Sequence, residues 1–166
     1  RAFRALDWWE ARCLEWCHAW HEPGLYSDQQ YLDRFPELFE GVHVLRNVRC
    51  CLAPWNLPSH RVERRGGEVR VDGDTPLVFY HFQGFRAHAP DLFTLAVDYR
   101  LRAEDRTCLY RPYAAAVREA METVRALDPE AYEKSFVPLP KPGPVRWLKR
   151  LKRKILGKNN LTRAPF

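Results

Sequence analysis

The sequence predicts an α/β fold, with helices flanking a mixed β-sheet and a basic amphipathic helix in the tail. Apolar residues recur at helical spacing near the amino terminus and again over residues 113–127. Between these segments lie an alternating hairpin pattern at residues 60–73 and an apolar run at residues 77–82. Residues 145–156 combine apolar and basic side chains at helical spacing. With 166 residues, of which 46% are hydrophobic, the chain is long enough to bury a core.

Charge is distributed unevenly along the chain. Residues 1–140 carry 18 Lys and Arg against 21 Asp and Glu, whereas residues 141–166 carry nine basic residues and no acidic residue. The net charge of +6 therefore comes from the tail and does not indicate a nucleic-acid-binding protein. We expect a folded part over residues 1–137, a stiff proline-rich linker over 138–144 and a basic tail over 145–166.

Cysteine usage and hydropathy bear on the compartment. The five cysteines include the adjacent pair Cys50 and Cys51, and neighbouring cysteines bridge each other only with strain, so we expect a reduced, cytosolic protein. No apolar run approaches the ~20 residues that a bilayer crossing needs. Arg1 already lies inside a helical pattern, so we expect the chain to be a piece of a longer protein.

The first helix is expected over residues 3–20 and would end before Pro23. Cys13, Cys17 and His21 would lie on one face of this helix, a spacing that suits zinc ligands. A fourth ligand outside the helix is missing. Burial of small, apolar cysteines in a tryptophan-rich helix explains the same pattern without metal.

A second helix is expected after Ser27, which has Gln30 at the spacing of a capping box. Asp28 and Gln29 would lie in its first turn. An acidic residue there also stabilises the helix dipole, so Asp28 is either a structural residue or part of a site at the mouth of the helix.

The middle of the chain is expected to form strands and turns. Residues 42–46 (VHVLR) predict a short strand, and residues 60–73 predict a hairpin that turns at two adjacent glycines. Residues 77–82 (LVFYHF) are apolar on both alternating faces and predict a strand covered on both sides. The DGD of Asp72 to Asp74 resembles paired aspartates that hold a cation, but Asp-Gly after a hairpin favours a turn.

His81 would stand at the carboxyl end of the strand at residues 77–82, and ligands bind at such ends in open α/β sheets. A neutral imidazole there would complete an oxygen-rich Mn or Mg site, and Gly84 would let the backbone pass close to a phosphate. The alternative is a core histidine that is hydrogen-bonded to a carbonyl.

Four segments, SDQQYLDRF, VHVL, APWN and VFYHFQGF, follow one another in this order. In order and spacing they resemble the carboxyl-terminal half of nucleotide-sugar-dependent glycosyltransferases with the GT-A fold, close to family 8 and related bacterial enzymes. The resemblance covers about residues 1–113. It implies that residues 1–137 belong to a catalytic domain that transfers a sugar from a nucleotide-sugar donor to a saccharide or lipid-linked acceptor, with retention of configuration.

The resemblance also implies roles for individual residues. Asp28 would orient the donor sugar, and Gln29 would face its anomeric carbon. His81 would be one ligand of a divalent metal, Mn or Mg, whose other ligands come from an upstream Asp-x-Asp. Trp55 and Asn56 would line the acceptor side. A metal on the diphosphate and oxygen groups around the sugar would stabilise the charges that develop during transfer.

The chain departs from the family pattern at two points. Where the family often has a lysine six residues after the metal histidine, this chain has Ala87. Either the preceding Arg86 meets the diphosphate in its place, or the phosphate contact is made differently. The DGD beginning at Asp72 follows Asp28 instead of preceding it, which is the wrong order for the metal motif. We therefore expect the nucleotide-binding half to be absent from this chain, and the isolated chain to be inactive.

The tail segment Val145–Leu156 has the pattern of an interfacial membrane helix. The residues expected at an anionic membrane surface are Trp147, Leu148, Lys149, Arg150, Leu151, Lys152, Arg153, Lys154 and Ile155. A solvated basic tail is the alternative, whereas nucleic-acid binding lacks a second basic patch. The protein would then lie on the cytoplasmic face of the membrane.

Two functions from different classes follow. The first is a fragment of a bacterial, metal-dependent glycosyltransferase that acts at the membrane. The second is a noncatalytic membrane-surface interaction domain on a decayed transferase scaffold.

Overall fold

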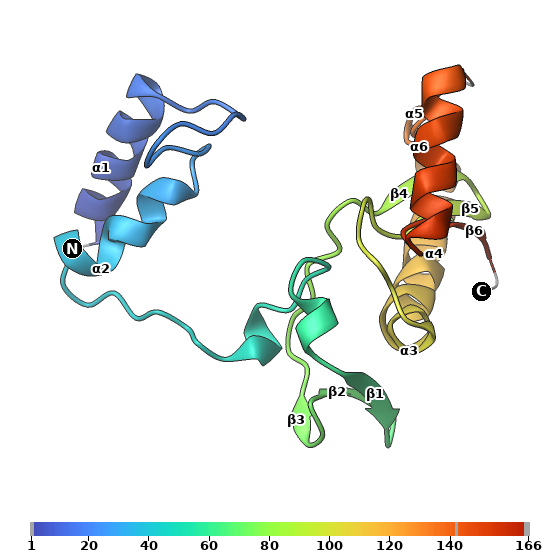
Figure 1. Ribbon diagram of the computed structural model, residues 1–166, viewed down its shortest axis with the longest axis horizontal. Coiled ribbons are helices and arrows are strands. Elements are labelled where there is room, and N and C mark those ends of the chain that lie inside the picture. Colours follow the sequence, from blue (N-terminus) through green and yellow to red (C-terminus); the bar gives the residue numbers. More distant parts are fainter. Residues whose placement is uncertain (1, 142, 165–166) are drawn as a thin grey trace. The chain divides into compact units, whose positions relative to one another are not determined.

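The structure is a computed structural model that describes residues 2–141 and 143–164. It contains helices and two small antiparallel sheets, so the prediction of both kinds of element is confirmed, although the sheets are not parts of one mixed sheet. The chain divides into two compact units, Arg1–Arg46 and Asn47–Phe166, each of which is described by itself (Figure 1).

The first unit is held together by aromatic side chains. It contains helix α1 (Ala2–Glu15), a 3-10 turn at Gln30–Arg34 and the short helix α2 (Phe35–Leu38). Trp8 of α1 makes edge-on ring contacts with Tyr31, Phe35 and Phe39, at centroid distances of 6.1, 6.1 and 5.9 Å. These contacts bury Tyr31 and fix the later turns against α1.

Three predictions for the first unit are wrong. The first helix ends at Glu15 instead of near residue 20, and an irregular loop follows. Ser27 has a positive φ of 53° and does not cap a helix, because its Oγ donates to Asp28 Oδ1 instead. Residues 42–46 form no strand, since they are exposed and pair with no other described segment.

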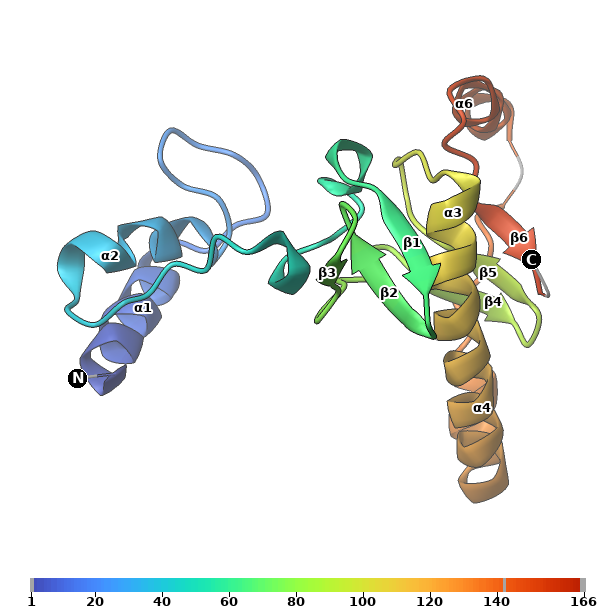
Figure 2. The same cartoon turned by 90° about the horizontal axis from the view of Figure 1, so that it is seen from below.

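The first sheet of the second unit is the predicted hairpin with one short strand added. Strands β1 (Val62–Arg65) and β2 (Glu68–Val71) pair through Val62 opposite Val71, and β3 (Thr75–Pro76) pairs with β2. Gly66 and Gly67 both have positive φ, as the tight connection requires. Asp72 to Asp74 form the turn from β2 to β3, so the turn interpretation is confirmed (Figure 2).

The second sheet has the order β4-β5-β6, with β4 at Arg86–Ala89, β5 at Leu92–Thr94 and β6 at Leu161–Arg163. β6 pairs with β5 in an antiparallel register, with Phe93 opposite Thr162. The segment that the sequence assigns to a basic tail therefore contributes a strand to this sheet.

The predicted strand at residues 77–82 is absent. The segment makes one isolated parallel bridge, between Tyr80 and Leu52, and the backbone N–H groups of Val78 and Phe79 both donate to Arg49 O. Val78 and Phe79 are 65% and 56% exposed, so the segment is not covered on both sides. Its apolar residues are shared between the core and the surface.

The second unit also contains several helical segments. Short 3-10 turns lie at Val48–Cys50 and Leu57–Ser59, and α3 (Ala103–Asp105) continues through a π-helical turn at Arg106–Tyr110 into α4 (Arg111–Leu127). The helix indicated by the apolar spacing over residues 113–127 is confirmed as α4. The Asp128 side chain accepts from Ala131 N and caps α5 (Pro129–Lys134). The largest fully buried side chains are Tyr110, Phe93, Leu52, Leu57, Leu95 and Val71.

The predicted basic helix is present as α6 (Pro144–Ile155). It lies alongside the β4-β5-β6 sheet (Figures 1 and 2). Among the described residues, no helix combines the length and the hydrophobicity needed to cross a membrane.

Candidate functional site

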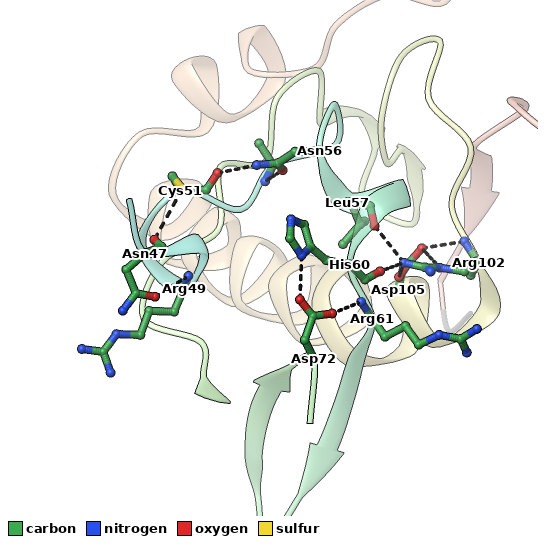
Figure 3. Close-up of polar contacts among 11 residues, drawn as sticks. Asn47, Arg49, Cys51, Asn56, Leu57, His60, Arg61, Asp72, Arg102 and Asp105 are labelled. Atoms are coloured by element: carbon green, nitrogen blue, oxygen red, sulfur yellow. Dashed lines mark hydrogen bonds and ion pairs between the residues drawn. The ribbon is translucent and has the colours of Figure 1, made fainter. Parts of the chain in front are cut away.

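Trp55 and Asn56 lie on a loop that closes on itself. The Asn56 side chain accepts from Ala53 N at 2.8 Å and donates to Cys51 O at 3.0 Å (Figure 3). Both polar ends of the amide are therefore used to hold the loop. Trp55, with 51% of its surface exposed, is the side chain of this pair that the loop presents to solvent.

The loop is fixed from outside by Arg102, at the start of α3. Its guanidinium donates to Leu57 O at 2.9 Å and also to His60 O. Asp105, only 1% exposed, orients Arg102 by accepting from its backbone N at 2.8 Å and its Nε at 3.1 Å. Figure 3 shows these groups converging beneath the loop. Nothing in the sequence signals this arrangement, because the partners lie more than 40 residues apart.

His81 is exposed and lies beside Trp55. The two rings meet at a centroid distance of 5.3 Å and an interplanar angle of 66°. His81 N donates to Leu52 O at 2.9 Å, which fixes the backbone at this position. The His81 imidazole makes no hydrogen bond with any other described residue, so its ring nitrogens are available to a ligand.

The preceding residue, Tyr80, is buried and anchors the segment that carries His81. Tyr80 and Tyr110 share a hydrogen bond of 2.8 Å between their hydroxyls. Burial raises the pKa of Tyr80 strongly and raises the pKa of Tyr110 to about 12. Both phenols therefore stay neutral at physiological pH and act as a structural pair.

Gly84 and Arg86 line a cavity of about 620 Å³, together with Gln83, Phe85 and residues 97–99. Gly84 has a φ of +78°, and a Cβ there would lie 3.1 Å from Val97 N. A glycine is therefore required by the fold itself. Arg86 is exposed, and its guanidinium has no ion pair or hydrogen bond within the described residues.

Asp28 and Gln29 belong to the first unit, whereas the other predicted site residues belong to the second. Asp28 Oδ1 accepts from Ser27 Oγ at 2.8 Å, and its carbonyl accepts from Trp9 Nε1 at 2.8 Å. Gln29 is exposed and directly precedes the 3-10 turn.

Within residues 2–141 and 143–164, no group of three or more His, Cys, Asp or Glu side chains is placed to hold a metal ion. Because α1 ends at Glu15, Cys17 and His21 lie beyond it, and the spacing that suggested zinc does not place them on one helix face. Burial and the neighbouring Cys17 raise the pKa of the Cys13 thiol. His81 remains a single candidate ligand.

His60 and Asp72 form a His–Asp pair that the sequence analysis does not predict. His60 Nδ1 lies 2.7 Å from Asp72 Oδ2, and Arg61 N donates to the other carboxylate oxygen at 2.8 Å. The Arg61 N–H and His60 lower the pKa of Asp72. Because these contacts join the two ends of the hairpin, they serve to close it.

Comparison with known proteins gives relatives from Bacillus subtilis (strain 168). The chain is 32% identical to "Uncharacterized protein YfnD" over 140 residues, which cover 82% of this chain and 44% of that protein. It is 29% identical to "Uncharacterized protein YfnF" over 125 residues, which cover 75% of this chain and 41% of that protein. The chain thus spans less than half the length of these curated relatives.

No family model matches the chain. No solved structure matches it either.

Proposed function

We propose that this chain is part of a metal-dependent glycosyltransferase of the GT-A fold, which transfers a sugar from a nucleotide-sugar donor to a saccharide or lipid-linked acceptor. The observation that carries the proposal is the contact between Trp55 and His81. The motif pattern assigns them to the acceptor side and to the metal, and the fold brings them together although they lie 26 positions apart in the sequence.

The chemistry of the site is compatible with these roles. An exposed indole offers a flat apolar surface for a sugar ring, and the adjacent free imidazole is a suitable ligand for Mn or Mg that is otherwise held by oxygen groups. The metal would neutralise charge on the departing diphosphate. The resemblance assigns the diphosphate to Arg86, whose guanidinium forms no ion pair within the described residues, and the donor sugar to Asp28 and Gln29.

Asn56 has a different part in this proposal from Trp55. Since its amide oxygen and nitrogen are both bonded to the loop backbone, it positions Trp55 for the acceptor instead of binding the acceptor through free polar atoms. Gly84 likewise shapes the turn that leads to Arg86.

A noncatalytic membrane-surface domain is the second candidate function. It is favoured by α6, whose apolar Leu148 and Ile155 are exposed and which carries six basic residues. Peripheral attachment to the cytoplasmic face of the membrane is common to both candidates, so sugar transfer decides between them.

Replacement of the proposed metal ligand tests sugar transfer. In the whole protein, His81→Ala is expected to lower Mn-dependent hydrolysis of the nucleotide-sugar donor by about two orders of magnitude, because the imidazole is lost from the metal. Donor hydrolysis measured across a Mn titration checks this. His43→Ala is the matched control, since His43 is exposed and outside the site.

Unchanged metal dependence in His81→Ala would remove His81 from the site. A whole protein that hydrolyses no nucleotide sugar in a donor screen would leave the membrane-surface domain as the function.

A further inference from the structure

The basic side of α6 faces the protein. Four of its cationic residues are spaced three or four positions apart and line one wall of a cavity of about 840 Å³: Arg146, Lys149, Arg150 and Arg153. The opposite wall comes from β4, β5 and residues 158–161. A helix that packs on a protein body ordinarily turns its apolar side inward. The orientation of α6 is the reverse.

The apolar side of α6 faces outward. Leu148, Leu151 and Ile155 lie on the side of the helix away from the cavity and are 58%, 40% and 76% exposed. Trp147, at the edge of the cavity, is also exposed. This side has the composition of a helix that lies in a membrane interface.

The orientation of α6 is fixed by contacts at its carboxyl end. Arg153 donates two hydrogen bonds to the carboxylate of Asp98, at 2.7 and 3.1 Å. The chain that follows enters the sheet as β6, and the buried side chain of Asn160 donates to Ala96 O and Tyr99 O. The helix is therefore held over the cavity by the fold.

The cavity carries a large excess of positive charge. Its lining includes six cationic residues that form no ion pair within the described part of the chain: Arg86, Lys141, Arg146, Lys149, Arg150 and Lys158. Asp98 is the one carboxylate in the lining, and Arg153 already occupies it. Hydrogen bonding to Arg153 lowers the pKa of Asp98, with Lys158 and Lys149 adding to the effect. Six like charges around one space repel one another unless an anion joins them.

The size and the lining of the cavity suit a phosphate group that belongs to a larger molecule. One arginine guanidinium can donate two parallel hydrogen bonds to the oxygens of a phosphate. Gly143, the N-cap of α6, lines the cavity, so the positive end of the helix dipole lies beside it. A volume of about 840 Å³ lies in the range of small-ligand sites and exceeds what inorganic phosphate fills. Leu139, Trp147 and Leu161 add apolar surface.

We propose that the cavity between α6 and the β4-β5-β6 sheet binds the phosphate or diphosphate headgroup of a membrane lipid, while the apolar side of α6 enters the lipid surface. The basic residues that face inward would hold the headgroup, and those that face outward would attract the membrane without selecting a headgroup. In the proposed transferase, the lipid-linked acceptor would carry this phosphate or diphosphate group. The identification of the bound lipid as the acceptor rests on the proposed function.

The first test separates a built site from general attraction. Pyrophosphate binding at physiological salt is measured by calorimetry on the 166-residue chain. Lys149→Gln/Arg150→Gln is expected to weaken binding by at least about tenfold, the scale of one charge-assisted hydrogen bond. The matched pair Lys152→Gln/Lys154→Gln removes the same charge from parts of α6 outside the cavity and is expected to change binding by less than about threefold. Equal losses of pyrophosphate affinity in the two double variants, or no pyrophosphate binding by the unaltered chain, would overturn the site.

The second test identifies the source of the phosphate. Leu148→Ser/Ile155→Ser is expected to abolish binding to phosphatidylcholine vesicles that contain phosphatidic acid and to leave pyrophosphate binding unchanged. Undiminished vesicle binding by this variant would overturn the lipid as the source. Vesicles with phosphatidylserine at the same surface charge should bind more weakly than those with phosphatidic acid, and this preference should vanish in the Lys149/Arg150 variant.

Both tests measure binding in the absence of a sugar donor. Their failure would leave the transferase proposal standing, and a lack of donor hydrolysis would leave the phosphate site standing.

Discussion

At the scale of single residues, Gly84 shows that the fold itself requires a glycine at a position predicted to bind the donor. Its φ of +78° is unfavourable for L-residues, and a Cβ at this position would lie 3.1 Å from Val97 N. The sequence predicts a glycine turn here that lets the backbone pass close to a phosphate. The structure adds that the same glycine lets the turn pack against residues 97–99, which complete the cavity beside Arg86.

Gly84→Ala is expected to lower the free energy of unfolding by about 2–3 kcal/mol, through backbone strain together with the contact at Val97. Gly67→Ala is the control, because Gly67 has a φ of +87° but nothing within 4 Å of its Cβ position. That change should cost only about 1 kcal/mol. Urea denaturation of both variants checks the difference, and similar losses would show that the approach to Val97 relaxes at no cost.

Sequence patterns identified candidate residues but not their neighbours. Separate motifs predict separate roles for Trp55 and His81. Their ring contact depends on the bridge between Leu52 and Tyr80, which no local pattern encodes. For Asn56, the motif suggested a role toward the acceptor. Its hydrogen bonds to Cys51 and Ala53 could be known only from the loop conformation.

At the scale of secondary structure, local chemistry explains which predictions hold. The hairpin of β1 and β2, helix α4 and helix α6 each carry their own stop signals or periodicity, and each appears where it was expected. Residues 42–46 and 77–82 have strand composition, but a strand needs a neighbour to pair with, and among the described residues no neighbour supplies a ladder. Pairing partners are a property of the tertiary fold.

The start of α3 positions the loop of Trp55, and this can be tested with Asp105→Asn. Removal of the buried charge leaves the Arg102 guanidinium without its counter-ion, so we expect a loss of about 3 kcal/mol in unfolding free energy. Amide hydrogen exchange at Leu57 and His60 should also accelerate, because Arg102 would no longer hold their carbonyls in place.

The control for this prediction is Glu130→Gln in α5. Glu130 forms an exposed ion pair with Lys134 one helical turn away, so its loss should cost no more than about 0.5 kcal/mol. If Asp105→Asn were equally mild, Arg102 would be held by the two carbonyls alone.

At the scale of the whole chain, charge and topology describe the tail differently. The charge divides near residue 140, and this division suggested an appendage that follows a linker. In the structure, the basic segment leaves the body as α6 and returns to it as β6. The composition predicts the basic helix α6. It does not predict β6, because this strand has only three residues of weak strand character and forms by pairing with the edge of β5.

Asn160 is the residue through which the tail joins the body, and its replacement tests that connection. It is 3% exposed, its side chain donates to Ala96 O and Tyr99 O, and it accepts from Arg106 at 2.6 Å. Asn160→Ala leaves two carbonyls and part of a guanidinium unsatisfied, so we expect a loss of about 3 kcal/mol in unfolding free energy. Asn159→Ala, at an exposed neighbour, should change it by less than about 0.5 kcal/mol. Thermal unfolding of both variants, together with protease cleavage after Lys158, measures this difference. If β6 holds the tail in place, Asn160→Ala will expose that bond to the protease and Asn159→Ala will not, whereas equal cleavage of both variants would show that the tail is held by Asp98 and Arg153 alone.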